Sequence, residues 1–235
     1  MKLKIISNPR KKWAGKLVPK IKKFLVDNGH RIVRKGADAT ICVGGDGTIL
    51  YSHHQKRLQG PVLAIGSKRS YICQLERSSW RRNILHALKG KTRKLMNIRA
   101  AVGKKHFSAL NDFVVHAKTY RVVGITVSYD GKSASFRGDG IIVSTALGSA
   151  AYAYSAGGKQ LPAAERRLSI VPICPYRRTF SPVIVPQNTK ITIKTDEDCA
   201  FIIDGIFHSV VKKGQKVNIQ KGVDVLFFEG VGQYH

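Results

Sequence analysis

One stretch of the chain, residues 39–48, reads ATICVGGDGT. Its first five residues form a short apolar and β-branched run of the kind that becomes a buried strand. The three glycines that follow let a backbone approach a ligand closely, because glycine carries no side chain. A helix expected from about Thr48 would present free N–H groups beside them, which favours phosphate binding. The stretch therefore predicts a strand, a phosphate-binding loop and a helix in succession.

Strands and helices alternate along the first part of the chain. Lys2 to Ser7 and Pro61 to Ile65 are short apolar runs that predict strands. Apolar residues recur at helical spacing from Leu17 to Leu25, and Arg77 to Leu88 predicts another helix. Pro19 fits the first of these helices only if it lies in the first turn, because proline has no N–H to donate within a helix. The alternation predicts a parallel sheet with crossover connections.

The second part of the chain, after about Lys94, carries a strand pattern instead. Apolar and polar residues alternate from Ile125 to Tyr129, and Asp130-Gly131 supplies a hairpin turn into the next strand. The same pattern continues in residues 191–194, 200–203 and 216–219. The sequence therefore predicts an α/β N-terminal domain, with a parallel sheet and helices, and a mostly-β C-terminal domain with two sheet layers.

The charge of the chain is extreme. It has 41 Lys and Arg against 14 Asp and Glu, a formal net charge of +27. Such a field favours polyanions, including nucleic acid, polyphosphate and nucleotides. The basic residues are spread from Arg10-Lys11-Lys12 to Lys212-Lys213, which is more typical of a solvated surface than of one binding arm. Nucleic acid stays an open partner class that this spread does not favour.

No segment predicts a membrane partner. Met1 to Pro9 combines two lysines with only a short apolar run, and no stretch of about 18 apolar residues occurs. The four cysteines lie far apart beside apolar residues, which predicts reduced thiols in the core: Cys42, Cys73, Cys174 and Cys199. We therefore expect a cytoplasmic protein.

Asp46 is the residue of the glycine cluster that can carry chemistry. Its charge repels phosphate, so its reasonable roles are to accept a proton from an attacking hydroxyl or to hold a metal ion. The structural alternative is a glycine turn with Asp46 as a helix cap, which is favoured for an isolated motif. The acids Asp112, Asp139 and Asp204 also lie at or beside strand ends, where side chains can enter a cleft. Because neither a P-loop nor Gly-x-Gly-x-x-Gly occurs, a nucleotide site here is of another type.

Further segments accompany the glycine cluster in a fixed order. They are Asn8-Pro9, Gly44 to Thr48, Asn111-Asp112, Arg137 to Gly140, Ser144 to Tyr152, Ser155 to Gly158, Pro172 to Pro175, and Asp204-Gly205. This order resembles the NAD kinase family, in its short archaeal or bacterial form, over nearly the whole chain. One such motif is weak, whereas several in order are specific.

The resemblance implies an NAD kinase-like fold of two domains. Residues 1–94 form the α/β nucleotide-binding domain, to which residues 220–235 return, and residues 95–219 form the β-rich NAD-binding domain. The implied reaction transfers the γ-phosphoryl group of ATP to the 2′-hydroxyl of the adenosine ribose of NAD, giving NADP. Inorganic polyphosphate is an alternative donor. Mg²⁺ or another divalent cation is implied on the phosphates, and no residues are predicted to ligate a metal, because Mg²⁺ keeps several waters.

The resemblance also assigns roles to residues. Asp46 would engage the acceptor hydroxyl, and Gly44, Gly45, Gly47 and Thr48 would lie near the donor phosphates. The expected dinucleotide-binding residues are Asn111, Asp112, Arg137, Asp139, Ser149, Ala151, Tyr152, Ser155 and Asp204. In the family, the residue matching Asp139 reaches the dinucleotide from a neighbouring subunit, so a homo-oligomer, a dimer or a tetramer, is implied.

The chain departs from the family pattern on the dinucleotide side. Ala146, Leu147 and Ala150 replace a proline and two threonines, and residues 66–73 replace a glycine-bearing Leu-Gly-Phe stretch. Asp112 stands where the family has glutamate. Because the Asp46 loop is intact, a working kinase with an adjusted pocket explains these changes better than an inactive one.

Two other functions stay open from the sequence. Lipid kinases of the diacylglycerol and sphingosine type share the Gly-Gly-Asp-Gly loop, but they would lack the Gly-Asp-Gly and Ser-Ala-Gly-Gly segments. A non-enzymatic polyanion-binding protein on the same fold would suit the charge of +27. Retention of Asp46 in a chain so poor in acids argues against it.

Overall fold

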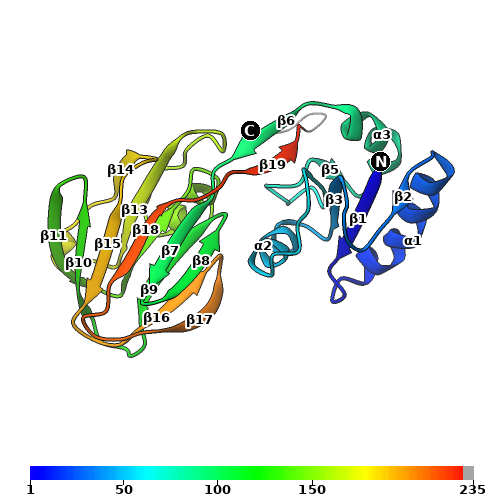
Figure 1. Cartoon of the computed structure of the whole chain (residues 1–235). Helices are drawn as coiled ribbons and strands as arrows, with labels where there is room; N and C mark the ends of the chain where they lie inside the picture. The colour runs from blue at the N-terminus through cyan, green and yellow to red at the C-terminus, as the bar shows by residue number, and fades with distance from the viewer. Residues whose placement is uncertain (230–235) are drawn as a thin grey trace. The chain divides into compact units, whose positions relative to one another are not determined.

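The computed structural model describes residues 1–229, and the chain divides into two compact units (Figure 1). Unit 1 contains Met1–Lys94 and the chain from Val225 onward, and unit 2 contains Leu95–Asp224. Strand β18 (Val217–Lys221) pairs with two strands of unit 2, so the return to unit 1 begins at Val225 and not at residue 220. The end of the expected returning segment, residues 230–235, lies outside the described residues.

Unit 1 is built on a seven-stranded sheet with the order β2-β1-β3-β4-β19-β6, and β5 pairs with β4. The strands are β1 (Lys2–Ser7), β2 (Arg31–Ile32), β3 (Ala39–Val43), β4 (Val62–Gly66), β5 (Leu75–Glu76), β6 (Thr92–Leu95) and β19 (Val225–Phe228). Strand β3 runs parallel to both neighbours, with Ile41 aligned to Ile5 and to Leu63. Every residue of β3 and β4 is buried, as expected where helices cover both faces of a parallel sheet. The predicted α/β domain is confirmed.

Three helices accompany this sheet: α1 (Lys12–Asp27), α2 (Asp46–His54) and α3 (Trp80–Lys89). Helix α1 buries Ala14, Ile21 and Leu25 in the core of unit 1. Pro19 lies inside α1 and not in its first turn, so that expectation was wrong. Buried residues on both sides of Pro19, Ala14 before it and Ile21 and Leu25 after it, anchor the helix, so packing offsets the cost of the hydrogen bond that proline cannot donate.

Unit 2 is mostly β, as predicted, with two six-stranded sheets. The first has the order β11-β10-β15-β18-β7-β8 and the second β14-β13-β12-β9-β16-β17. The first sheet contains β7 (Ile98–Val102), β8 (Lys105–Ala109), β10 (Val123–Tyr129), β11 (Lys132–Gly138), β15 (Ile191–Thr195) and β18. The second contains β9 (Asp112–Ala117), β12 (Gly140–Ser144), β13 (Arg167–Ile173), β14 (Val183–Pro186), β16 (Cys199–Ile203) and β17 (Ile206–Val211).

One hydrophobic core joins the two sheets of unit 2. Ile125 and Ile193 from the first sheet share a buried cluster with Phe113 and Phe201 from the second. Short helical turns η1 (Gly148–Ala150), α4 (Tyr152–Ser155) and η2 (Tyr176–Arg178) connect the strands of the second sheet. Among residues 1–229, no helix is long and apolar enough to cross a membrane.

Candidate active site

The glycine cluster lies where β3 ends, in the middle of the unit 1 sheet. Gly44 and Gly45 have φ angles of 153° and 98°, which side-chain-bearing residues rarely adopt. A Cβ atom at Gly44 would lie 2.3 Å from Oγ1 of Thr48, so the space also requires glycine. Asp46 then opens the nine-residue helix α2. The first N–H groups of α2 therefore lie at the carboxyl end of a parallel strand, where α/β sheets bind ligands.

The carboxylate of Asp46 is held by the segment that follows β4. Its Oδ2 atom accepts a hydrogen bond from the backbone N–H of Tyr71 (2.7 Å), and Oδ1 accepts one from Ile72 (2.9 Å). Oδ1 also lies 3.7 Å from the thiol sulfur of Cys73. Asp46 therefore joins two loops, which is not the helix cap of the structural alternative. Each carboxylate oxygen has two lone pairs, so Oδ2, which accepts from Tyr71, can accept a second donor such as a substrate hydroxyl.

The thiol beside Asp46 stays protonated. Burial, and then the charge of Asp46, raises the pKa of Cys73. A protonated thiol can donate a weak hydrogen bond, so Cys73 is a third donor toward the carboxylate. Cys73 supports Asp46 in this way and does not act as a nucleophile, which would require a thiolate.

Two polar side chains flank Gly45. The ammonium of Lys11 donates a hydrogen bond to the carbonyl of Gly44, and a Cβ atom at Gly45 would lie 3.2 Å from that ammonium. On the other side, the same Cβ atom would lie 3.1 Å from Oγ of Ser70. Ser70 Oγ accepts a hydrogen bond from the backbone N–H of Ser67 (3.1 Å), which orders the turn between them. A cation and a hydroxyl thus border the glycine loop.

In unit 2, the carboxylate of Asp204 holds a corner of the backbone. It accepts hydrogen bonds from the N–H groups of three consecutive residues, Leu110–Asp112, at 3.1, 2.7 and 3.1 Å. Asp204 and Gly205 have φ angles of 49° and 77° and form a two-residue hairpin turn like that of Asp130-Gly131. Asp204 therefore holds the backbone of Asn111 and Asp112 in position through these hydrogen bonds.

Asp112 is a buried carboxyl group beside another acid. It opens β9, aligned with Ser144 of β12, and only 3% of its surface is exposed. Burial, and then the charge of Asp204, raises the pKa of Asp112 to about 7. Near neutral pH this carboxyl group therefore exists in both protonation states, and the protonated form can donate a hydrogen bond.

The segment after β12 presses against Asn111. A Cβ atom at Gly148 would lie 2.2 Å from the carbonyl oxygen of Asn111, and the hydroxyl of Thr145 donates to the carbonyl of Leu110 (2.5 Å). Ser149 is fully buried, donates to the carbonyl of Ala146 and accepts from Leu161. Its hydroxyl is thus used to fix the backbone of this segment.

Tyr152 lies near three groups, Cys174, Asp112 and Asp139. Partial burial and the neighbouring Cys174, Asp112 and Asp139 raise the pKa of Tyr152. The thiol of Cys174 hydrogen-bonds to Asp139, which raises the pKa of Cys174. Cys174 is exposed and has a φ angle of 45°, so the prediction of a core cysteine was wrong there. Cys42 and Cys199 are buried as predicted.

Two buried polar atoms of the predicted site lack a hydrogen-bond partner among the described residues. They are Oγ1 of Thr48, at the glycine loop, and Oδ1 of Asn111, beside Asp112. Buried polar atoms are almost always paired in folded proteins, so an orphaned one needs a reason. A bound ligand or water that pairs with the Thr48 hydroxyl, and one that donates a hydrogen bond to Asn111 Oδ1, would be such a reason.

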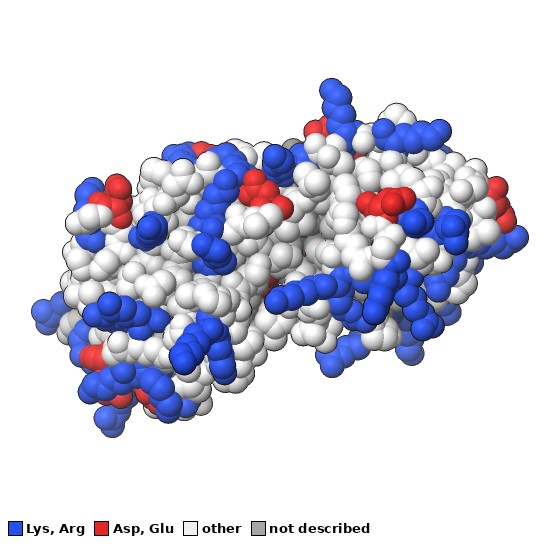
Figure 2. Space-filling view, in the orientation of Figure 1, with Lys and Arg blue, Asp and Glu red and all other residues white. Residues whose placement is uncertain are grey.

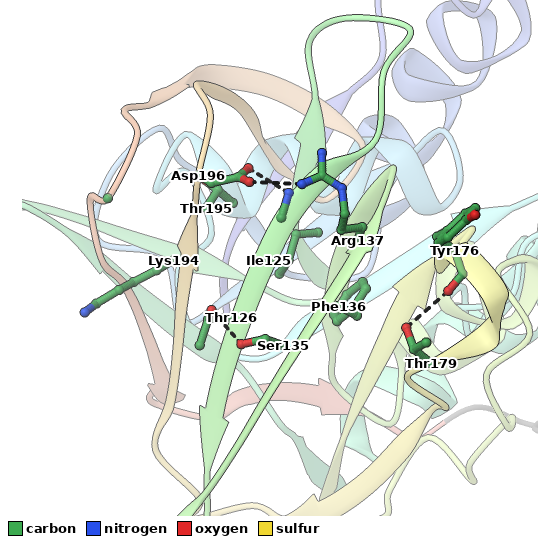
Figure 3. Close-up of a pocket in the computed structure, with 12 residues that line it drawn as sticks. Ile125, Thr126, Ser135, Phe136, Arg137, Tyr176, Thr179, Lys194, Thr195 and Asp196 are labelled. Atoms are coloured by element: carbon green, nitrogen blue, oxygen red, sulfur yellow. Dashed lines mark hydrogen bonds and ion pairs between the residues drawn. The ribbon is translucent and has the colours of Figure 1, made fainter.

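Arg137 lies apart from this group. It is exposed on β11, where its guanidinium pairs with Asp196 (3.5 Å) and donates to the carbonyl of Val122 (3.1 Å). It lines an open cavity of about 570 Å³ whose wall also contains Phe136 and Tyr176. Figure 3 shows two interactions among the residues that line this cavity, the Arg137–Asp196 pair and the hydrogen bond between Thr179 and Tyr176. Of the predicted site residues, Arg137 is the one that lines this cavity.

The structure thus forms two groups from the predicted residues. Unit 1 contains the glycine loop with Asp46 and Thr48. Unit 2 places Tyr152 near both Asp112 and Asp139, and Asp204 accepts a hydrogen bond from the N–H of Asp112. Ala151 and Ser155 are exposed at the start and end of α4. Sequence reasoning gave no site role to Lys11, which lies two residues after Asn8-Pro9, or to Cys174, which lies within Pro172 to Pro175.

Comparison with known proteins identifies the family. Residues 110–228 match the model of the ATP-NAD kinase C-terminal domain. The chain is 32% identical to an NAD kinase of Thermoplasma acidophilum over 208 residues, which covers 85% of this chain and 76% of that protein. It is 29% identical to an NAD kinase of Thermomicrobium roseum over 238 residues, covering 93% of this chain and 82% of that protein.

Solved structures show the same fold. An NAD kinase from Archaeoglobus fulgidus in complex with ATP superposes with a TM-score of 0.86 at 22% identity, covering 98% of this chain and 94% of that one. Yeast NADH kinase complexed with NADH superposes with a TM-score of 0.82 at 18% identity, covering 98% and 84%. The family model, which matches half of the chain, and the Thermoplasma acidophilum relative at 32% identity show that the chain belongs to the NAD kinase family.

Proposed function

We propose that this kinase transfers the γ-phosphoryl group of ATP to the 2′-hydroxyl of the adenosine ribose of NAD and so makes NADP. The observation that carries the proposal is the Asp46 carboxylate, which two backbone N–H groups fix beside the glycine loop. Phosphoryl transfer requires mainly positioning of the nucleophile and compensation of charge on the phosphates. A pre-oriented carboxylate supplies the first of these requirements.

Asp46 acts on the acceptor hydroxyl in this proposal. The free lone pair on Oδ2 accepts the hydroxyl hydrogen bond, which orients the hydroxyl oxygen for attack, and Oδ2 receives the proton as the phosphoryl group moves. The N–H groups of Tyr71 and Ile72 keep the carboxylate in one orientation during this step. The segment after β4, which departs from the family pattern, is therefore part of the catalytic apparatus.

The glycine loop and its neighbours receive the donor phosphates. Gly44, Gly45 and Gly47 leave the backbone accessible, and the first turn of α2 offers N–H groups to an anion. The orphaned Oγ1 of Thr48 gains a partner when a phosphate oxygen or its water binds. Lys11, whose ammonium lies against Gly44, supplies a positive charge at the edge of the loop. These groups suit the triphosphate of ATP and also inorganic polyphosphate.

The Asp112 group of unit 2 binds the adenosine half of NAD in this proposal. Asn111 contributes the orphaned Oδ1 atom as an acceptor, and Asp112 contributes a carboxyl group that donates when protonated. Tyr152 adds an aromatic face that is 41% exposed, with Ala151 and Ser155 in the same short segment. Asp139 serves a neighbouring subunit in a homo-oligomer, as the family pattern implies.

A divalent cation, Mg²⁺, enters the proposal with the nucleotide. Among residues 1–229, no three His, Cys, Asp or Glu side chains form a metal cluster. Mg²⁺ prefers phosphate oxygens, water and one or two carboxylates, so a site with Asp46 as its nearby carboxylate fits an ion brought by the phosphates. When bound, the ion supplies positive charge to the phosphoryl group, and the residues of the chain orient the hydroxyl.

We also propose that the protein acts in the cytoplasm. Its four cysteines are free thiols, which suits a reducing compartment.

A donor and acceptor panel tests the proposed reaction. The purified protein is incubated with Mg²⁺, with ATP or polyphosphate as donor, and with NAD, NADH, diacylglycerol or sphingosine as acceptor, and the products are separated chromatographically. The proposal expects NADP from NAD with at least one donor and no lipid product. A protein that binds NAD but forms no NADP with either donor contradicts the proposal, and phosphorylated lipid would favour the lipid-kinase alternative.

A further inference from the structure

The positive charge of the chain is concentrated in unit 1. Unit 1 has 23 Lys and Arg against 5 Asp and Glu, a formal charge of +18, whereas unit 2 has 18 against 9, a formal charge of +9. Two thirds of the net charge therefore lies in fewer than half of the residues. Figure 2 shows Lys and Arg side chains gathered over the part of unit 1 where Figure 1 draws α1. The basic residues, which are spread along the sequence, are thus concentrated in one unit of the fold.

Helix α1 carries a row of lysines on one face. Lys12, Lys16, Lys20 and Lys23 fall within an arc of about 80° around the helix axis, since each residue advances by about 100°. All four are exposed, and the helix buries Ala14, Ile21 and Leu25 on its opposite side. Successive lysines of the row lie about 6 Å apart along the helix. We call these four residues the lysine face.

The positive charges of the lysine face are electrostatically unfavourable for helix α1 itself. The first turn of α1 contains no acid and begins with Lys12, although a helix N-terminus favours negative charge. Lys12 and Lys16, and Lys16 and Lys20, are like-charged neighbours four residues apart, which destabilises a helix. Of the ion pairs among residues 1–229, one lies in unit 1, between Lys23 and Asp27 (3.4 Å). An anion that binds along this face would relieve the repulsion.

Two arginines, Arg81 in α3 and Arg77 just before it, add positive charge beside the lysine face. Helices α1 and α3 pack together through Phe24 and Trp80, whose rings lie edge to face with centroids 5.6 Å apart. The guanidinium of Arg81 lies 5.1 Å from the Phe24 ring, and that of Arg77 lies 5.5 Å from the Trp13 ring. Both arginines are exposed, and the aromatic rings hold their guanidinium groups in place.

We propose that the lysine face, with Arg77 and Arg81, binds the sugar–phosphate backbone of nucleic acid without reading its sequence. Rows of exposed cations at regular spacing match a repeating anion, and such contacts gain free energy by releasing counterions. A membrane surface fits less well, because amphipathic helices bind lipid through an apolar face, and that face of α1 is buried in the core. This binding goes beyond kinase activity and does not depend on the Asp46 site.

Fluorescence anisotropy with a labelled 20-base-pair DNA duplex of mixed sequence, between 50 and 200 mM KCl, tests the proposal. The wild type should bind with a steep salt dependence and should bind a shuffled duplex equally well. Replacing the lysine face with glutamine (K12Q, K16Q, K20Q and K23Q together) should weaken binding at 50 mM KCl by about tenfold or more. The slope of log K against log salt should become shallower by about 3, since each phosphate contact contributes about 0.9.

A matched variant controls for the loss of four charges. Lys104, Lys105, Lys132 and Lys213 are exposed in or beside turns between strands of unit 2, and their replacement by glutamine should leave duplex binding within about threefold of the wild type. Both variants should keep the wild-type NADP-forming activity, which verifies that they fold. The proposal is overturned if the wild type does not bind the duplex at 50 mM KCl, or if the control variant loses as much affinity. It is also overturned if phosphatidylserine-containing vesicles bind and the duplex does not.

Discussion

Two carboxylates among the predicted site residues, Asp46 and Asp204, accept backbone N–H groups from distant segments, and we propose different roles for them. Asp46 accepts one backbone N–H on each oxygen and the Cys73 thiol on Oδ1, so Oδ2 keeps a lone pair for a substrate, and the residue lies partly exposed beside the glycine loop. Asp204 takes three N–H groups and is 8% exposed, so it holds the corner that carries Asn111 and Asp112. Its exposure and the lone pair left on Oδ2 distinguish Asp46, which we propose to be reactive, from the structural Asp204.

Lys11 should contribute to binding of the donor phosphates, whereas the neighbouring Lys12 should not. Lys11→Met removes a charge-assisted contact of about 1.5–3 kcal/mol, so kcat/KM for ATP should fall by about 10- to 100-fold. Lys11→Arg should restore part of the loss. Lys12→Met removes the same charge one residue away, where no contact to the glycine loop is made, and steady-state kinetics should stay within twofold of the wild type. Equal losses in the two methionine variants would show that the overall field, and not the position of Lys11, is responsible.

Asp112 should make stability depend on pH. Its pKa is about 7 in the fold against 3.8 when unfolded, so above pH 3.8 the unfolded state ionises while the folded state stays protonated. Folding stability therefore falls as the pH rises toward 7 and levels off above it. Asp112→Asn lacks this ionisation and should gain about 2–3 kcal/mol over the wild type between pH 5 and pH 8. Urea unfolding at the two pH values measures the gain.

The control for this titration is Asp130→Asn, which alters an acid in an exposed hairpin turn. Its stability relative to the wild type should not change between pH 5 and pH 8. A pH-independent difference for Asp112→Asn would mean that Asp112 is ionised in the fold.

At the scale of elements, the loop between strand β3 and helix α2 depends most on the glycine at position 44. Gly44→Ala would place Cβ 2.3 Å from Thr48 Oγ1 at a φ angle of 153°, so we expect a loss of about 1–3 kcal/mol in stability and a large loss of activity. Gly15→Ala, inside α1, meets nothing within 4 Å and should stabilise the protein by up to about 1 kcal/mol. Thermal unfolding compares the two, and a tolerated alanine at position 44 would contradict the account of the loop.

Local patterns predicted the elements well, because their causes are local. The apolar runs of β3 and β4 and the Asp130-Gly131 hairpin follow from residue spacing and turn chemistry. The glycine loop was predicted for the same reason. Pro19 was misjudged because tertiary packing on both sides overrides the local cost of a proline.

The contacts that hold the site residues in place could not be predicted from the sequence, because they join residues that are distant along the chain. Asp204 lies 92 residues from Asp112, and nothing local shows that its carboxylate faces the backbone of residues 110–112. Arg137 is two residues from Asp139, yet it is exposed on β11 and pairs with Asp196. The N–H groups that hold Asp46 come from Tyr71 and Ile72, and backbone donors leave no mark in a sequence.

At the scale of the whole molecule, the net charge of +27 should limit stability at low salt. Like charges repel in the compact state, and the Debye length shrinks from tens of ångströms at low salt to a few ångströms near 1 M. Raising KCl from 20 to 500 mM should raise the midpoint of thermal unfolding by at least about 3 °C, the shift that corresponds to roughly 1 kcal/mol. The lysine-face variant should show a smaller rise, and a midpoint that does not move with salt would mean that the charges are already compensated.

The most direct test of the central claim is the rate of NADP formation by Asp46→Asn, measured with saturating NAD and donor. The account predicts that kcat falls by about 100-fold or more, because asparagine cannot accept the hydroxyl proton, while calorimetry still detects NAD binding. Asp130→Asn, an acid outside the site, should keep the wild-type rate. If Asp46→Asn retained more than a tenth of the wild-type kcat, the carboxylate held by Tyr71 and Ile72 would not be the group that acts on the acceptor hydroxyl.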